Sequence, residues 1–163
     1  MSWRTSLICL LAACVLAGCG YGFSGKQAPS VLAPGSTLAI SKIEHPTMDA
    51  SLEHTLRRLL REELGNRGLA QWADEDAAQA LLNVTVRRLL SRSEVKDQED
   101  VTLRSYLEIH LDAEIRRSAD KTLLWRSGPL SVRWSYTGDE AAARREVLVL
   151  AVRELADRMR QAY

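Results

Sequence analysis

The stretch VTLRSYLEIHLDAEIR, residues 101–116, decides how this chain of 163 residues folds. Its apolar side chains occupy odd positions and most of its polar side chains occupy even ones, which is the period of a strand with one buried and one solvated face. The apolar set is Val101, Leu103, Leu107, Ile109, Leu111, Ala113 and Ile115, and the polar set is Thr102, Arg104, Tyr106, Glu108, His110, Asp112, Glu114 and Arg116. Because a strand with one apolar face needs a covering layer, the stretch predicts a sheet packed against other elements.

Three shorter segments carry a similar strand pattern. They are residues 36–43, residues 81–90 and residues 123–136. The first stops before Pro46, because proline has no ladder donor and restricts the residue before it. The third is interrupted by Gly128-Pro129, where we predict a bulge or break in the strand.

Two segments have helical spacing instead. Between Ser51 and Gly68 the apolar residues at this spacing are Leu52, Leu56, Leu59, Leu60 and Leu64. Asp49 or Ser51 is the candidate N-cap of this helix, and Gly65 or Gly68 is its candidate stop. In the second segment, Asp139 is the expected N-cap of a helix that runs to about Gln161. Its apolar stripe is Leu148, Ala151, Val152, Leu155 and Met159.

The predicted order of elements is therefore β-α-β-β-β-α. Two apolar helix stripes and one apolar sheet face cover each other if both helices lie on the same side. The fold class is α+β, a two-layer sandwich with two helices packed on one face of a four-stranded mixed sheet. We expect the first β-α-β crossover to be right-handed with parallel strands, and the later strands to be antiparallel.

The first 35 residues differ from the rest of the chain. A short apolar run ends in Leu16-Ala17-Gly18-Cys19, which resembles the lipobox of bacterial lipoproteins, and is too short to span a bilayer. We predict a signal peptide over residues 1–18, lipid attachment at Cys19, a lipidated tether over residues 19–35 and a single domain over residues 36–163. Since Gly20 and not Asp follows the cysteine, outer-membrane sorting is expected.

Composition and charge exclude several function classes. The chain has 22 Lys and Arg against 21 Asp and Glu, so it lacks the basic excess of a nucleic-acid binder, and we expect no nucleic-acid partner. All three cysteines lie in the first 19 residues, so the domain has no thiol to pair. The sequence contains no G-x-S-x-G, phosphate loop, C-x-x-C or H-E-x-x-H motif. We therefore expect no enzyme activity, cofactor or metal.

The most suggestive polar group for acid-base chemistry or a cation lies on the long strand. His110 shares its strand face with Glu108, Asp112 and Glu114, although a solvated sheet face is the commoner reason for such a run. His45 and His54 have no spaced partner, which favours a solvated or locally bonded role over metal ligation.

Three further groups of residues have alternative interpretations. Five basic residues gather around the second strand, the next loop and the third strand, where they could grip a phosphate-bearing ligand; they are Arg87, Arg88, Arg92, Lys96 and Arg104. Another basic group, at residues 57–61, is interpreted as a solvated helix face because Glu62 and Glu63 follow it. The aromatic residues could line a lipid groove, but packing in the core or on the sheet is preferred; they are Trp72, Trp125, Trp134 and Tyr136.

Taken together, these features resemble the LptE family of lipopolysaccharide-assembly lipoproteins. The residues that carry the resemblance are Gly18-Cys19-Gly20-Tyr21-Gly22-Phe23-Ser24-Gly25, Leu38-Ala39-Ile40, Leu52-Glu53, Arg67-Gly68, Leu124-Trp125, Tyr136 and Leu155-Ala156. Gly22 departs from the pattern, because family members often carry a bulky polar residue there.

The resemblance implies a lipid-anchored protein on the periplasmic side of the outer membrane. Such a protein sits inside the LptD β-barrel as plug and assembly factor while lipopolysaccharide passes to the outer leaflet. The resemblance also implies lipopolysaccharide binding through basic residues near one end of the sheet, for which Arg92, Lys96 and Arg104 are the matching candidates here.

Two other functions stay open at the level of sequence. One is a lipid-binding or phosphate-binding accessory lipoprotein of another envelope transporter, which would use Arg92 or Arg104. The other is a hydrolase or lyase that uses His110 with Glu108 or Asp112.

Overall fold

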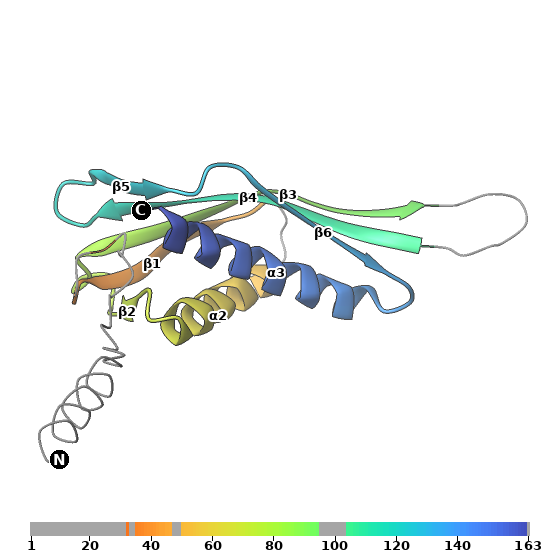
Figure 1. Ribbon diagram of the computed structural model, residues 1–163, viewed down its shortest axis with the longest axis horizontal. Helices are drawn as coiled ribbons and strands as arrows, with labels where there is room; N and C mark the ends of the chain where they lie inside the picture. The colour runs from red at the N-terminus through yellow and green to blue at the C-terminus, as the bar shows by residue number, and fades with distance from the viewer. Residues whose placement is uncertain (1–31, 33–34, 47–49, 95–103, 163) are drawn as a thin grey trace, which may run out of the picture.

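The computed structural model describes residue 32 and residues 35–46, 50–94 and 104–162 (Figure 1). The elements in chain order are β1 (Thr37–Glu44), α2 (Ala50–Asn66), β2 (Gln71–Trp72), β3 (Ala80–Glu94), β4 (Arg104–Arg117), β5 (Leu123–Arg126), β6 (Leu130–Tyr136) and α3 (Glu140–Gln161). The predicted α+β class is confirmed, since two helices cover one face of a mixed sheet and leave its other face open (Figure 1).

The sheet has the order β2-β1-β3-β4-β5, and β6 also pairs with β4. The predicted parallel pairing of the first two long strands is confirmed, because β1 pairs with β3 in parallel. The pairs β3–β4, β4–β5 and β4–β6 are all antiparallel, as expected for strands joined by short connections.

The prediction of four strands was wrong by two. The short strand β2 follows α2 and pairs in parallel with the start of β1, at Thr37 and Leu38. The segment 123–136 is divided into β5 and β6, which both pair with β4. The division falls at Gly128-Pro129, where Gly128 has a φ of 67° and proline has no N–H for the ladder, so the predicted break is confirmed.

Strand β4 is the centre of the core. The odd-numbered side chains from Leu107 to Ile115 are all buried, and they pack with apolar side chains of both helices in one cluster. Both predicted helix stripes are part of it, including Leu56 and Leu64 of α2 and Leu155 of α3. The alternation therefore selected the correct face of this strand over residues 105–116; Val101 and Leu103 lie outside the described residues.

A β-bulge changes the phase of β3. Leu82, Val84 and Val86 are buried as predicted, but the register with β4 shifts between Val86 and Arg88. The extra residue is Arg87, and beyond it the core side of the strand passes to odd positions such as Leu89, which packs against the core. The bulge therefore keeps the strand amphipathic although its sequence parity changes.

The ends of the helices follow local capping rules. Helix α2 ends in a Schellman motif, in which Gly68 N–H donates to Gly65 C=O (2.9 Å) and Leu69 N–H donates to Leu64 C=O (2.9 Å). Gly68 has a φ of 66° and is the stop, whereas Gly65 lies inside the helix. Asp139 caps α3 as predicted, because its side chain accepts from the N–H groups of Ala141 and Ala142.

Leu32, which precedes β1, is part of the core of the domain. This residue belongs to the segment predicted as the tether, and its side chain is 4% exposed within the main core cluster. It also lines a cavity of about 590 Å³ together with Ala80, Arg117 and Leu124. Leu32 therefore enters the fold at the end of the sheet where β4 terminates, away from the β3–β4 connection.

Two residues singled out in the sequence lie outside the described residues, namely the N-cap candidate Asp49 and the lipid-attachment candidate Cys19. The other N-cap candidate, Ser51, lies inside α2, which begins at Ala50.

Candidate functional site

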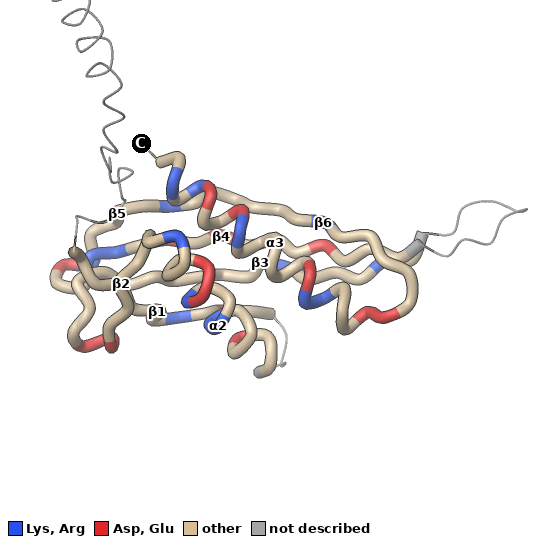
Figure 2. Tube along the Cα trace, turned by 60° about the horizontal axis from the view of Figure 1, so that its bottom comes forward, with Lys and Arg blue, Asp and Glu red and all other residues tan. Residues whose placement is uncertain are grey.

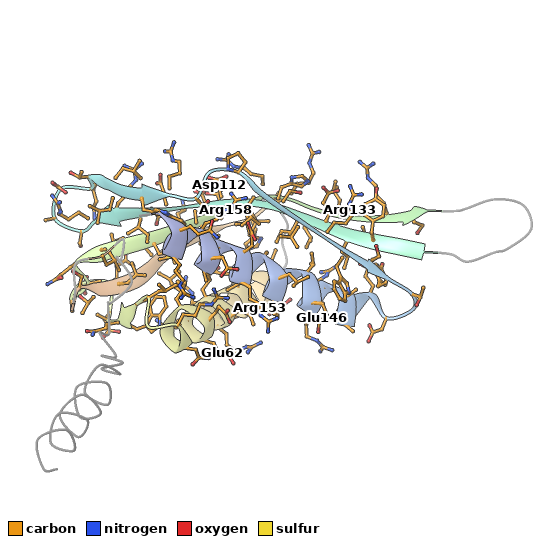
Figure 3. The ribbon with its side chains drawn as sticks, in the orientation of Figure 1. Glu62, Asp112, Arg133, Glu146, Arg153 and Arg158 are labelled. Carbon is orange, nitrogen blue, oxygen red and sulfur yellow. The ribbon has the colours of Figure 1, made fainter. Side chains whose placement is uncertain are left out.

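The sheet face that the helices leave open is the candidate functional site. The even-numbered side chains of β4 lie on it, flanked by side chains of β3 on one side and of β5 and β6 on the other. Figure 3 shows Asp112 and Arg133 on this face, whereas Glu62, Glu146 and Arg153 belong to the helix layer. We call the part beside β5 the β5 half (Asp112, Glu114 and Arg116 of β4) and the part beside β6 the β6 half (Tyr106, Glu108 and His110).

Charges in the β5 half are balanced by mutual ion pairs. Glu114 accepts two hydrogen bonds from Arg116, at 2.7 and 3.0 Å, and one from Arg126 at 3.4 Å. The hydrogen bonds from Arg116 hold the pKa of Glu114 below its usual value, against the opposing effect of desolvation. The bulge residue Arg87 donates to both carboxylate oxygens of Asp112, at 2.6 and 3.2 Å. In these ion pairs the charged side chains of this half neutralise one another.

The β6 half is organised around Glu108. Its carboxylate accepts from the Ser131 hydroxyl (3.1 Å) and from Arg133 (3.3 Å), and lies 3.2 Å from His110 Nε2. Desolvation opposes the ionisation of Glu108, but the hydrogen bond from Ser131 and the charge of Arg133 outweigh it and lower its pKa. The guanidinium of Arg133 also stacks over the Tyr106 ring, 4.5 Å from its centroid.

The β6 half carries an excess of positive charge. Arg88 and Arg92 lie on β3 directly opposite His110 and Tyr106 of β4, and both are exposed. Neither arginine has an ion pair with another described residue. Together with Arg133 they place three arginines on the same face as Glu108, the one carboxylate that β4 contributes to this half. This half can therefore hold an anionic ligand by charge-assisted hydrogen bonds.

Two of the residues predicted to bind lipopolysaccharide, Arg92 and Arg104, lie at the end of this half where β3 ends and β4 begins. Arg92 is exposed on β3, and Arg104 begins β4, where its backbone pairs with that of Glu94. Lys96 and the lipid-attachment candidate Cys19 lie outside the described residues. Their binding roles stay predictions, while the register places positions 92 and 104 on one face of neighbouring strands.

Sequence reasoning missed Arg133 and Tyr106 as members of the site. Their proximity depends on β6 pairing with β4 such that Arg133 lies opposite Glu108. The available signal was the odd-numbered position of Arg133 within an alternating strand, because odd positions there face away from Val132 and Trp134. That signal does not reveal the strand partner, which follows from the break at Gly128-Pro129.

The acid-base candidates on the same face are engaged in ion pairs. His110 contacts Glu108, while Asp112 and Glu114 are bound to arginines. Within the described ranges no group of three or more His, Cys, Asp or Glu residues could hold a metal ion. His54 is exposed on α2.

The basic helix residues have mixed surroundings. Arg58 pairs with Glu62 at 3.2 Å on the exposed surface, as expected for a solvated face. Arg57 instead is half-buried and donates to the backbone carbonyl of Ile40 in β1 (2.7 Å). Figure 2 shows Lys and Arg interleaved with Asp and Glu along the helices, and α3 carries the i,i+4 ion pairs Glu140–Arg144 and Glu154–Arg158.

The aromatic residues mainly pack, as preferred from the sequence. Trp125 is buried in the core, and Trp72 packs against it while its indole N–H donates to Arg61 C=O (3.0 Å). Tyr136 also packs against the core. Trp134 differs, because 38% of it is exposed. No helix in the described part of the chain combines the length and hydropathy needed to cross a bilayer.

Several solved structures share this fold at low sequence identity. A PelC dodecamer from Paraburkholderia phytofirmans is 15% identical, with 80% of this chain and 91% of that chain covered and a TM-score of 0.52. A minor lipoprotein from Acinetobacter baumannii is 13% identical, with 80% and 96% covered and a TM-score of 0.53. The hypothetical protein CT253 from Chlamydia trachomatis is 7% identical, with 77% and 95% covered and a TM-score of 0.53.

Comparison at the level of sequence identifies the family. No curated protein matches the chain. The model of the LptE family, described as lipopolysaccharide-assembly, matches residues 36–162, which include every helix and strand described above. The chain therefore belongs to the LptE lipopolysaccharide-assembly family.

Proposed function

We propose that this protein is a non-enzymatic lipoprotein of the outer membrane, anchored through Cys19 on the periplasmic side. In this proposal it forms a complex with an LptD-type β-barrel, acts there as plug and assembly factor, and assists the assembly of lipopolysaccharide into the outer leaflet. Membership in the LptE family supports the part in lipopolysaccharide assembly. The lipobox at residues 16–19 supports the anchor.

The observation that carries the barrel partnership is the open sheet face. It is lined by ion-paired side chains from β3, β4, β5 and β6, and no described helix or strand covers it, although the segment around Ala78 packs against Ala39 and Leu81 at its β1 side. The lumen of a membrane β-barrel is polar, so a domain held inside it needs a hydrophilic surface rich in donors and acceptors. The helix layer meets the same need, because its outer surface carries i,i+4 ion pairs such as Arg58–Glu62 and Arg144–Glu140.

The β6 half supplies the proposed contact with lipopolysaccharide. Arg92, Lys96 and Arg104 are the proposed binding residues, and the geometry adds Arg88 and Arg133 to the same face. Guanidinium groups bind phosphate in a bidentate manner, and the phosphate groups of lipopolysaccharide are suitable acceptors. Glu108 fixes Arg133 in place, so one arginine of this group is oriented before any ligand arrives.

Affinity purification of the full-length chain tests the partnership. An epitope-tagged chain is extracted from membranes with a mild detergent, and its stoichiometric companions are identified by mass spectrometry. We expect a barrel of much greater mass to be retained. The Cys19→Ala variant is the matched control for the anchor, and it should no longer fractionate with the outer membrane. A chain that is released with an unmodified amino end and no companion would contradict the proposal.

The second candidate function is a lipid-binding or phosphate-binding accessory lipoprotein of another envelope transporter. The observation that favours it is the absence of ion pairs at Arg88 and Arg92 among the described residues. It predicts that the full chain binds inorganic phosphate or anionic lipid vesicles without any barrel. A stable barrel complex, combined with a chain that binds neither probe, would exclude this candidate.

A further inference from the structure

The two edges of the sheet differ in how their backbone groups are satisfied. At the β1 edge, Leu38 C=O accepts from Ala73 N–H (3.1 Å) and Ile40 C=O accepts from Arg57 (2.7 Å). Ser41 adds a hydrogen bond to Glu75 (2.5 Å), and β2 pairs with the first residues of β1. This edge is therefore covered by short local contacts, which is the usual protection against unwanted strand pairing.

The opposite edge has no such cover along β6. This strand of seven residues pairs with β4 and with no other strand of the described chain. Arg158 of α3 donates to the carbonyls of Ser127 (3.0 Å) and Pro129 (2.8 Å), which precede β6. From Leu130 to Tyr136 the outer edge of β6 thus presents backbone donors and acceptors in an extended conformation.

Exposed apolar side chains lie at two separate places along this side of β4, because β5 pairs with it near Ile115 and β6 pairs with it near Leu107. Among the described residues the large hydrophobic side chains with most exposure are Leu123 on β5 (42%) and Trp134 on β6 (38%). Trp134 lies directly opposite Leu107, so it projects from the helix-covered side of the sheet, beyond the area that α3 protects. A tryptophan in this position is suited to anchor an apolar side chain of an added strand.

The charge at the centre of β6 selects the kind of strand. Arg133 is the middle residue of Leu130–Tyr136, and its side chain is 58% exposed on the open face. Two copies of this chain that paired through β6 about a central two-fold axis would place Arg133 against Arg133, and like charges directly opposite each other are destabilising. An acidic residue opposite Arg133 is favourable instead. Pairing of two copies in this central register is therefore disfavoured.

We propose that the outer edge of β6 pairs with an extended segment of a partner protein, which places an acidic side chain opposite Arg133 and an apolar side chain against Trp134. This inference rests on the proposed function in one respect, namely that the barrel protein supplies the segment. Since the strands of a closed barrel have no free edge, the segment must come from a loop or a terminal region of that protein.

Site-specific photocrosslinking in the full-length, membrane-anchored chain tests this pairing. A photoreactive residue replaces Trp134, and the matched control places the same residue at Lys42 on the covered β1 edge. We expect the residue at position 134 to crosslink to one short segment of the barrel protein that contains acidic and apolar residues. Crosslinks that join two copies of this chain, or that are as frequent from position 42, would overturn the inference.

A proline scan of β6 distinguishes backbone pairing from other contacts. Proline removes one N–H group, and successive N–H groups along a strand point to opposite edges. Proline at Ser131, Arg133 and Ser135 removes N–H groups on one edge of β6, and proline at Val132 and Trp134 removes N–H groups on the other. The two sets of variants should therefore differ in their effects on complex formation and on Tm. One set should lower the yield of the complex about tenfold without changing Tm, and the other set should lower Tm. A uniform effect across all five positions would also overturn the inference.

The outcomes separate the two proposals. If no barrel protein copurifies with the chain, the proposed function fails, whatever the crosslinks show. If the barrel copurifies while position 134 gives no crosslink to an extended segment, the strand pairing alone is wrong.

Discussion

The two faces of β4 come from one stretch of sequence but make different kinds of contact. On the covered face, Leu107, Ile109 and Leu111 are buried among the helices, and any side chain of similar volume and polarity could serve there. On the open face, Glu108, Asp112 and Glu114 each bind a particular arginine from a neighbouring strand or from β4 itself. We therefore expect substitutions on the covered face to affect mainly stability, and substitutions on the open face to affect mainly the proposed binding.

The largest expected effect comes from the covered face. Ile109 is fully buried, so Ile109→Ala should lower the free energy of unfolding by about 2–5 kcal/mol, because the methyl groups leave a cavity. The neighbouring variant His110→Ala, on the open face, should cost less than about 1 kcal/mol. Denaturant unfolding of the full chain measures both. An equal loss of unfolding free energy in Ile109→Ala and His110→Ala would contradict the assignment of stability to the covered face.

The next effect concerns binding and not stability. Reversing two charges in the β6 half with Arg88→Glu and Arg92→Glu should weaken lipopolysaccharide binding by the full chain at least about tenfold, since each lost charge-assisted hydrogen bond contributes about 1.5–3 kcal/mol. The unfolding free energy should change little, because both side chains are exposed. Arg126→Glu in the β5 half is the matched control, and an equal loss of binding in that variant would contradict the division between the halves.

A smaller effect is expected from the ion pairs of the β5 half. Glu114→Gln removes the carboxylate that accepts from Arg116 and Arg126, and should lower the free energy of unfolding by about 0.5–1 kcal/mol. High salt should reduce the difference in unfolding free energy between variant and parent, because it screens these partly exposed charges. A loss as large as that of Ile109→Ala would show that the open face also carries the stability of the fold.

The smallest effect is a dependence of stability on pH. The folded-state pKa values of Glu108 and Glu114 are lowered from 4.5, so these groups stabilise the fold above that pH. Their contribution should be lost as the pH falls through the lowered values. Unfolding of the parent should thus become easier below about pH 4.5, and the double variant Glu108→Gln and Glu114→Gln should flatten this slope. Ile109→Ala should lower the free energy of unfolding equally at every pH, without changing its slope against pH.

The same comparison explains how far the sequence could predict the structure. Period-two alternation identified the covered face of β4, and helical spacing with Asp139 identified α3, because these signals are local and repeated. Gly128-Pro129 predicted a break, since both residues act on their own backbone. These features account for the two layers, and the crossover rule for the helix between residues 36–43 and 81–90 accounts for the parallel β1–β3 pair.

The remaining features depend on contacts between distant parts of the chain. Strand β2 is only two residues long and exists because it meets β1. The bulge at Arg87 is defined only by the register with β4, and Arg133 enters the site only through the β4–β6 pairing. Leu32 looked like part of a spacer, because its burial depends on the sheet end that receives it. Periodicity in the sequence contains none of this pairing information.

The burial of Leu32 determines how the body can be presented to a membrane. Twelve residues lie between Cys19 and Leu32, so a segment of at most roughly 45 Å joins the proposed anchor to the end of the sheet at Arg117. Arg92 lies about 40 Å further along β3, towards the opposite tip. With the anchor proposed at Cys19, the end of the sheet at Arg117 would lie on the membrane side, and Arg92 would lie at the far end of the domain.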